Sequence, residues 1–205
     1  MFNSKEFDDF INEYDKLTST SDKNNKYPFA GYNKVLDRIY NIVIQTPKAK
    51  VLDLGFGTGK LTNKLYKQGL DIYGQDYSEK SVELAKEKMP NAHFYQADFS
   101  DGLVKPLTKQ KYDYIVATYA LHHLNDEQKI VLISELLNNL NENGKILIGD
   151  ISFENRELLN NCHQNAIDDW DEEETYFVKD EFKKVFPNLE YEPISFCGGV
   201  FIISK

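Results

Sequence analysis

Hydrophobic residues recur at helical spacing near the N-terminus and then in short runs from residue 50 onward. The N-terminal pattern predicts two helices separated by a polar loop at 18–26, and Pro47 ends the second helix. The residues that carry this spacing are Phe7, Phe10, Ile11, Tyr14 and Leu17 in the first helix, and Phe29, Tyr32, Leu36, Ile39, Tyr40 and Val43 in the second. We therefore expect a helical cap over residues 1–47 and a core domain over residues 48–205.

Beyond residue 48, short hydrophobic runs alternate with amphipathic segments, which is typical of a parallel sheet covered by helices on both faces. The last two predicted strands are separated by only three residues, and so short a link joins antiparallel neighbours. We thus predict a doubly wound, mostly parallel seven-stranded α/β sheet whose last strand is antiparallel. The predicted strands are 50–54, 71–76, 92–96, 112–118, 144–151, 189–196 and 200–205, and the helices between them are 58–68, 78–89, 126–140 and 178–186.

Composition and charge narrow the function classes. The chain has 205 residues and a net charge of -9, and only Arg38 and Arg156 among its 24 basic residues are arginine. An acidic chain with so few guanidinium groups is a poor nucleic-acid binder, so we expect no nucleic-acid partner. No hydrophobic run approaches the length of a membrane span, and the first residues lack a signal-peptide pattern, so we expect a cytoplasmic protein without a membrane partner. Cys162 and Cys197 lack metal-ligand spacing and are predicted to be buried free thiols.

A glycine-rich loop follows the first predicted strand of the core domain. Gly55, Gly57 and Gly59 stand where that strand gives way to a helix, a position that lets backbone N–H groups approach an anion. The G-x-G-x-G spacing differs from the G-x-G-x-x-G of dinucleotide folds, and Asp53 just before it would repel a pyrophosphate. A ligand with an ammonium or sulfonium group beside one carboxylate would suit this loop. The alternative is that the glycines only make the turn.

Acidic residues stand at the ends of the next two strands. Asp76 ends strand 71–76, where a carboxylate accepts hydrogen bonds from both ribose hydroxyls in doubly wound sheets. Asp98 follows strand 92–96 and could accept from an adenine amino group. Either residue alone could instead cap a helix. Together with Asp53 they place acids at three successive strand ends, which favours a nucleoside-containing ligand.

The motifs in this order resemble those of the class I S-adenosylmethionine-dependent methyltransferases, with their Rossmann-like fold, and most closely small bacterial members with N-terminal cap helices. The matching segments are VLDLGFGTG, YGQDYSEKSVELAKEK, FYQADF, YDYIVATYALHHL and GKILIGD. The resemblance implies S-adenosyl-L-methionine as cofactor, with contacts from Asp53, Gly55, Phe56, Gly57, Gly59, Asp76, Tyr77, Asp98, Phe99 and Thr118. Two residues depart from the family pattern: Phe56 is bulky and could narrow the loop, and Gln75 is polar where the family prefers an apolar residue.

The acceptor pocket is predicted at the end of strand 112–118, where the strand order reverses. Tyr119, His122 and His123 lie there, and either histidine could act as a base, orient the acceptor or only pack. We expect no metal site, because adjacent histidines diverge and no third ligand lies at a recognisable spacing. The resemblance implies that cap tyrosines reach over the cofactor, which makes Tyr14 and Tyr32 further pocket candidates.

An acidic run at 168–174 is predicted to begin a solvated helix, where carboxylates favour the helix dipole. Alternatively it borders the acceptor entrance and favours a cationic substrate.

The sequence thus predicts methyl transfer from S-adenosylmethionine to a small-molecule acceptor. No N-P-P-Y motif or Pro-Cys nucleophile for base methylation is present. Two alternatives stay open: transfer of another group from a modified cofactor, and a non-catalytic sensor of the cofactor. The sequence assigns neither the catalytic residue nor the oligomeric state.

Overall fold

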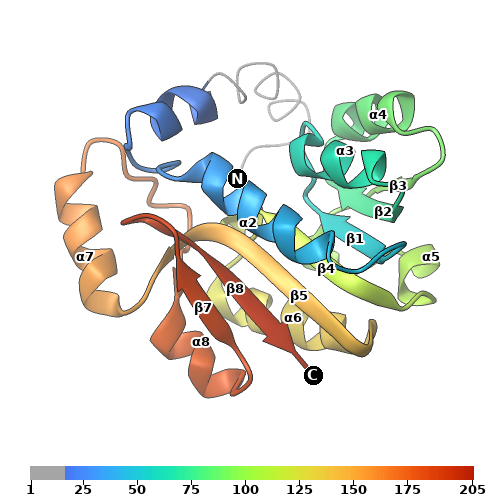
Figure 1. Cartoon of the computed structure of the whole chain (residues 1–205). Coiled ribbons are helices and arrows are strands. Elements are labelled where there is room, and N and C mark those ends of the chain that lie inside the picture. The colour runs from blue at the N-terminus through green and yellow to red at the C-terminus, as the bar shows by residue number, and fades with distance from the viewer. Residues whose placement is uncertain (1–16) are drawn as a thin grey trace.

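An eight-stranded sheet forms the centre of the computed structural model, which describes residues 17–205 (Figure 1). Seven strands follow the order β3-β2-β1-β4-β5-β8-β7, and β6 pairs with the end of β5. The strands are β1 Lys50–Leu54, β2 Asp71–Asp76, β3 His93–Gln96, β4 Tyr112–Thr118, β5 Leu140–Phe153, β6 Phe177–Val178, β7 Glu190–Pro193 and β8 Gly198–Ser204. β1 to β5 are parallel neighbours, whereas β8 runs antiparallel to both β5 and β7. The predicted α/β class with a reversed last strand is confirmed.

Helices cover both faces of this sheet. In Figure 1, α2 crosses in front of β4, β5 and β8, while α6 lies behind the sheet. The helices are α2 Tyr32–Val43, α3 Lys60–Lys67, α4 Glu79–Lys88, α5 Lys105–Thr108, α6 Asp126–Leu137, α7 Arg156–Asn165 and α8 Lys179–Val185. Short 3-10 turns span Phe99–Asp101 and Leu121–His123. None of the helices in the described residues is long and apolar enough to cross a membrane.

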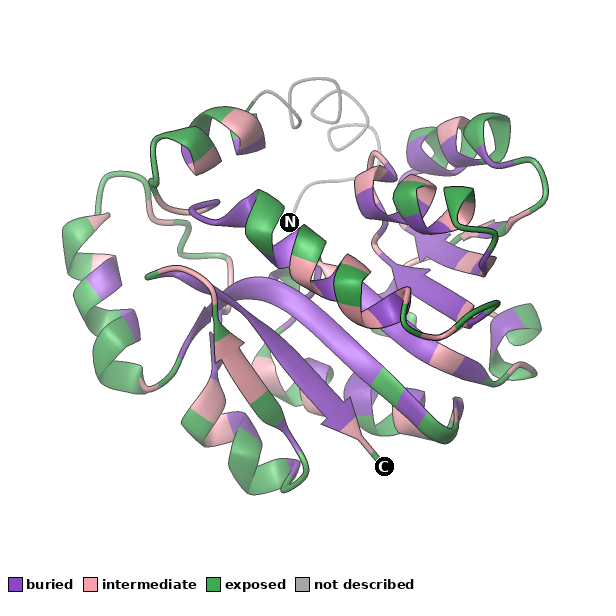
Figure 2. Cartoon of the chain, viewed as in Figure 1, coloured by how far each residue is buried: buried purple, intermediate pink, exposed green. Residues whose placement is uncertain are grey.

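The hydrophobic core consists of two layers, one on each face of the sheet. Alternate residues of a strand point to opposite faces, so in β1 Val51 joins the layer under α2, α3 and α4, and Leu52 joins the layer that contains α6 and α8. Figure 2 shows this as buried strands between helices whose outer faces are exposed. α2 approaches β5 closely because Gly149 has no side chain: a Cβ there would lie 2.4 Å from Val35 Cγ1.

Several local predictions were wrong. Residues 17–23 are helical, although 18–26 was predicted as a loop, and Thr18 and Ser21 are buried. Polar residues tolerate burial when they are hydrogen-bonded, and the Ser21 hydroxyl donates to the carbonyl of Lys26 while accepting from the N–H of Phe29. Helix α7, which begins after the capping residue Asn155, was not predicted. The strand β6 was also missed, because two residues are too few to show a pattern.

The acidic run 168–174 is a loop with turns rather than the predicted start of a helix. It connects α7 to β6 and lies at the carboxyl edge of the sheet, where the functional site is found.

Candidate functional site

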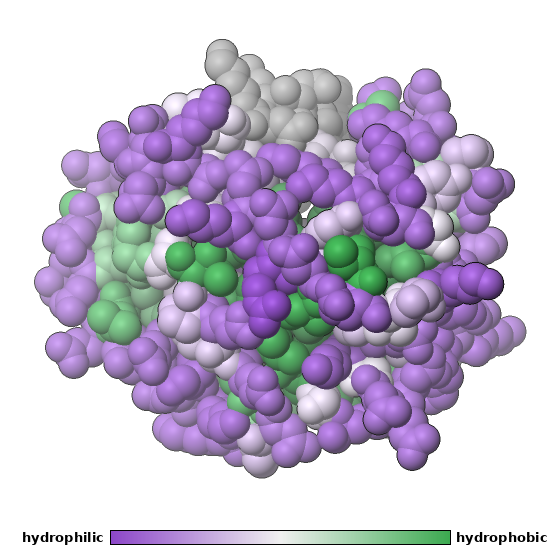
Figure 3. Space-filling view, in the orientation of Figure 1, coloured by the Kyte–Doolittle hydropathy of each residue, from purple (hydrophilic) through white to green (hydrophobic). Residues whose placement is uncertain are grey.

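A cavity of about 600 Å³ opens at the carboxyl edge of the parallel strands. Its walls come from four segments: residues 17–36, the glycine loop, the turn after β4 and the 169–174 loop. A second cavity of about 160 Å³ continues from it, and both are lined by Gly55, Tyr119, His123, Asp171 and Glu174. Hydrophilic residues cover most of the face in Figure 3, and hydrophobic residues show between them near its centre. β1 pairs with β2 on one side and β4 on the other, so the cavities lie at the predicted switch point.

The glycine loop turns with three left-handed residues. Gly55, Gly57 and Gly59 have φ of 65°, 53° and 73°, values that residues other than glycine rarely adopt. A Cβ at Gly55 would lie 2.5 Å from Ala120 Cβ, so this glycine is needed for packing. Apart from Gly57 itself and its two neighbours in the chain, no atom of the described residues lies within 4 Å of the Cβ position at Gly57. The backbone at Gly57 therefore borders open space that a side chain would fill.

Asp76 ties the glycine loop to the end of β2. One carboxylate oxygen accepts from the N–H of Gly57 at 2.7 Å, and the other accepts from the N–H of Ser78 at 2.9 Å. The residue is only 3% exposed and lines the second cavity. Its carboxyl group is thus held at the cavity wall by two backbone donors.

Asp53 lies beneath the loop and lines neither cavity. One of its oxygens accepts from the Thr62 hydroxyl at 2.7 Å, and Oδ1 has no hydrogen-bond partner among residues 17–205. Burial, together with the nearby charge of Asp76, raises the pKa of Asp53 to about 7 although the Thr62 hydrogen bond opposes the shift. An unsatisfied buried acceptor beside the loop suits a ligand that carries a donor or a positive charge.

The predicted adenine-side residues gather at the second cavity. Tyr77, Asp98 and Phe99 line it together with Asp76. Asp98 also accepts from the N–H of Ser100 at 2.8 Å and so caps the 3-10 turn, which was the alternative considered for it.

The two departures from the family pattern have structural explanations. Phe56 is 6% exposed and packs its ring against Phe94 at 4.9 Å, so most of the side chain fills the core. Gln75 is fully buried, donates to the carbonyl of Gly102 and accepts from the N–H of Val104. It therefore fixes the segment that follows β3.

The end of β4 supplies Thr118 and Tyr119 to the larger cavity. Tyr119 has φ of 50°, a strained value for a non-glycine residue, and its ring lies 4.8 Å from that of Tyr32. Its hydroxyl is buried without a hydrogen-bond partner in the described chain, and burial raises its pKa well above 10. Tyr32 and Tyr119 are thus brought together at the cavity, whereas Tyr14 lies outside the described residues.

His122 is buried in a pair with a carboxylate that the sequence analysis did not single out. Its Nδ1 lies 2.6 Å from Asp150 Oδ1, and Asp150 is fully buried at the carboxyl end of the sheet. Burial alone would lower the pKa of His122, but the charges of Asp150 and Glu174 outweigh it and raise the pKa. Asp150 shows the converse: burial alone would raise its pKa, and His122 lowers it.

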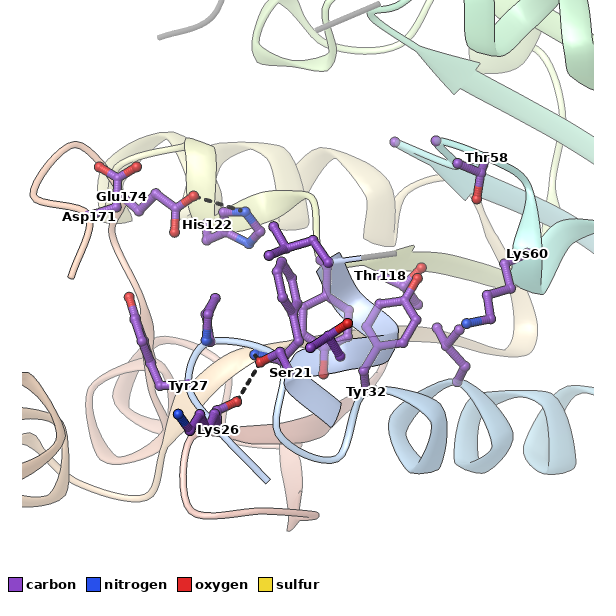
Figure 4. Close-up of a pocket in the computed structure, with 18 of the residues that line it drawn as sticks. Ser21, Lys26, Tyr27, Tyr32, Thr58, Lys60, Thr118, His122, Asp171 and Glu174 are labelled. Atoms are coloured by element: carbon purple, nitrogen blue, oxygen red, sulfur yellow. Dashed lines mark hydrogen bonds and ion pairs between the residues drawn. The ribbon is translucent and has the colours of Figure 1, made fainter. Parts of the chain in front are cut away.

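Glu174 faces both histidines. Its Oε1 lies 3.4 Å from His122 Nε2 and 3.9 Å from His123 Nδ1 (Figure 4 shows the first contact). The two imidazole rings have centroids 4.2 Å apart. The expectation that the adjacent histidines diverge was therefore wrong, because the 3-10 turn at Leu121–His123 brings the rings together.

The loop that carries Glu174 is fastened at several points. The N–H of Thr175 donates to the carbonyl of His122 at 2.9 Å, and the buried ammonium group of Lys129 donates to the carbonyl of Thr175 at 2.5 Å. Tyr176 donates its hydroxyl hydrogen to Glu174 Oε2 at 2.8 Å, and its oxygen also contacts the hydroxyl of Tyr27. The Glu174 carboxylate is thus fixed beside the turn after β4.

Sequence reasoning missed Asp150 and Lys129, and it considered Glu174 only as part of the acidic run 168–174, for which the acceptor entrance was one alternative. Asp150 could have been found, because it ends a predicted strand as the three recognised acids do. The choice of Glu174 within the acidic run could not have been made, because its position depends on the path of an irregular loop.

Comparison with known proteins identifies the family. The profile of a family described as Methyltransferase domain matches residues 45–188. An uncharacterized methyltransferase of Alkaliphilus oremlandii is 33% identical over 193 residues, which cover 90% of this chain and 87% of the relative. The chain belongs to the methyltransferase family. A further methyltransferase, from Bacillus cytotoxicus, is 35% identical over 78% of this chain and 72% of the relative.

Solved structures share the fold of this methyltransferase. Magnesium protoporphyrin IX methyltransferase from Synechocystis, solved with bound SAH, gives a TM-score of 0.67 at 17% identity and covers 86% of this chain and 85% of its own. The structure described as a DhpI-SAM-HEP complex gives a TM-score of 0.68 at 15% identity, with coverage of 97% and 94%. At these identities the likeness shows the fold, and the predicted resemblance to class I methyltransferases is confirmed at that level.

Proposed function

We propose that this methyltransferase transfers a methyl group from S-adenosylmethionine to a small-molecule acceptor. The observation that carries the proposal is the open space over Gly57, bordered by the Asp76 carboxylate at the switch point of the sheet. When bound, the cofactor supplies a methyl group on a sulfonium centre. One structural neighbour was solved with bound SAH and the other as a complex with SAM, which supports this choice.

The residues present fit this cofactor. Asp76 would accept from ribose hydroxyls, and Tyr77 and Phe99 would flank the base in the second cavity. At the other end, Lys60 and the start of α3 would hold a carboxylate, since a helix N-terminus and an ammonium group both favour negative charge. Asp53 lines neither cavity, so its unsatisfied oxygen would favour the ammonium group of the same amino-acid portion electrostatically rather than by direct contact.

The two ends of the larger cavity are lined by different kinds of residue, which supports a binding place for the acceptor that is separate from that of the cofactor. Figure 4 shows Thr58 and Lys60 on one side and His122, Asp171 and Glu174 on the other. A volume of about 600 Å³ is within the range of small-molecule sites. The acidic wall opposes an anionic acceptor, so we propose an uncharged or cationic one. The cytoplasmic location stays a prediction from the sequence.

The rate of methyl transfer would depend mainly on the orientation and desolvation of the acceptor. Methyl transfer from a sulfonium needs little proton chemistry when the acceptor is already nucleophilic. We therefore assign Tyr119, His122 and His123 to orienting the acceptor.

The test is calorimetry with S-adenosylhomocysteine followed by an assay for its release with a panel of small amines, thiols and phenols. We expect binding by the wild type, none by Gly57→Val, and release with at least one acceptor. Absence of wild-type binding would overturn the cofactor assignment. Binding without release for any acceptor would favour the sensor, and release only with a protein or nucleic acid would overturn the acceptor class.

A further inference from the structure

Three potential metal ligands converge where the two cavities meet. His122 Nε2, His123 Nδ1 and a Glu174 carboxylate oxygen all lie within 4.8 Å of one another. All three residues line the larger cavity, and His123 and Glu174 also line the smaller one. The cluster thus lies at the junction of the two cavities and can be reached from them.

The distances from the two histidine nitrogens to the Glu174 oxygen are closer to the spacing of ligands around one metal ion than to hydrogen-bond lengths. Two ligand atoms on a tetrahedral ion with bonds of about 2.0–2.1 Å are roughly 3.3–3.4 Å apart. The distance from His122 Nε2 to Glu174 Oε1 is 3.4 Å, and that from His123 Nδ1 to the same oxygen is 3.9 Å. Both exceed the usual 2.7–3.2 Å for N–H···O hydrogen bonds. All three ligand atoms lie within 4.8 Å of one another, so the side chain of His123 would have to move toward the other two to complete the geometry.

His122 is oriented for coordination by the carboxylate behind it. Its Nδ1 donates to Asp150 Oδ1 at 2.6 Å, and this leaves Nε2 facing the cluster. Asp150 is itself held by the N–H groups of Leu121 and Ile151. Histidine ligands of metals commonly donate their other ring N–H to a carboxylate, which fixes the tautomer and the ring orientation.

Glu174 is likewise held in place before any ion binds. The Tyr176 hydroxyl occupies Oε2 at 2.8 Å, so Oε1 is the oxygen presented to the histidines. Thr175, the residue after Glu174, has its main chain fixed by two hydrogen bonds: its N–H donates to His122, and its carbonyl accepts from Lys129. A site with oriented ligands loses little conformational entropy on binding.

We propose that His122, His123 and Glu174 form a binding site for a divalent cation with the ligand preferences of Zn²⁺. Two imidazole nitrogens and one carboxylate suit this class of ion. Three protein ligands leave a coordination position open toward the cavity, as in catalytic rather than structural zinc sites. A hydroxyl, a thiol or water is the type of ligand that such a position takes.

The experiment uses full-length protein freed of metal with a chelator and titrated with Zn²⁺ in the absence of cofactor. We expect one ion to bind per chain. When Co²⁺ replaces Zn²⁺, we expect the visible absorption spectrum of a Co²⁺ ion with low coordination number. Asp150→Asn should weaken Zn²⁺ binding about 10–100-fold, as loss of an orienting carboxylate does elsewhere. His123→Gln and Glu174→Gln, which remove ligands, should weaken it by more. Because His122 is buried, it is not used as a test variant.

The matched control is His163→Gln. His163 also faces an acidic residue, with Nε2 3.1 Å from Glu172 Oε1, but this pair is exposed and lies outside the cluster. We expect His163→Gln to bind Zn²⁺ like the wild type, and His123→Gln, Glu174→Gln and His163→Gln to unfold at temperatures similar to the wild type without metal. The proposal is overturned if the wild type binds much less than one ion, or if His123→Gln and Glu174→Gln retain its affinity. Because no cofactor or acceptor is present, failure here leaves the proposed methyl transfer standing.

Discussion

Replacement of Asp76 by asparagine should weaken cofactor binding and also lower the free energy of unfolding. The two effects can be measured separately. The carboxylate accepts one N–H from Gly57 and one from Ser78, and an amide has only one oxygen with which to accept. One buried N–H is thus left without an acceptor, which costs about 1–3 kcal/mol of folding free energy. The ribose hydroxyls lose a charged acceptor worth about 1.5–3 kcal/mol, so Kd for S-adenosylhomocysteine should rise about 10- to 150-fold.

Calorimetry measures the dissociation constant, and urea denaturation measures the free energy of unfolding. Asp71→Asn is the matched control, because Asp71 begins the same strand and its side chain is 44% exposed, with Lys50 3.8 Å away. We expect this control to change neither quantity appreciably. If Asp76→Asn lowered stability but left the dissociation constant unchanged, Asp76 would be a structural residue of the loop and the ribose assignment would fail.

The other predictions concern buried or tightly packed positions. Gly57→Val should abolish S-adenosylhomocysteine binding while circular dichroism shows a folded chain, because the strain at φ of 53° costs only about 1–2 kcal/mol and the side chain projects into the cavity. Gly149→Ala should lower the free energy of unfolding by about 1–3 kcal/mol in urea, since its Cβ would overlap Val35; an unchanged midpoint would show that α2 shifts freely. The raised pKa of Asp53 means that the folded chain binds a proton there that the unfolded chain releases, so stability should fall as the pH rises from about 4 to about 7. Asp53→Asn should remove that part of the pH dependence, and identical pH profiles of the two proteins would contradict it.

The fold could be predicted because its signals are local. Most strands of the core contain a short hydrophobic run, and the reversal of β8 follows from the short link 194–197 that joins it to β7. The glycine loop and Asp76 could also be predicted, because a strand end fixes where its next residues lie. Ser21 escaped prediction because its burial depends on hydrogen bonds to Lys26 and Phe29 rather than on hydrophobicity.

The contacts on the acidic side of the cavity could not be predicted, because they are made by segments far apart in the chain. Glu174 contacts His122 only because the 166–176 loop folds back over the turn after β4 and is held there by a hydrogen bond from Lys129. No periodicity marks such a loop. The assumption that His122 and His123 point apart failed for a related reason, because it ignored the 3-10 turn between β4 and α6.

Trp170 is the single tryptophan of the chain, and its place gives the protein a built-in optical reporter. Its indole stacks on Tyr27 at 5.1 Å and on His163 at 4.6 Å, and the edge of Tyr176 approaches at 4.8 Å. It therefore spans the junction between the segment before α2 and the loop that carries Glu174. Indole fluorescence responds to stacking and to nearby ionisable groups, so emission from this one residue reports the separation of these two walls. Entry of a ligand that parts them can be followed in real time on the unlabelled protein.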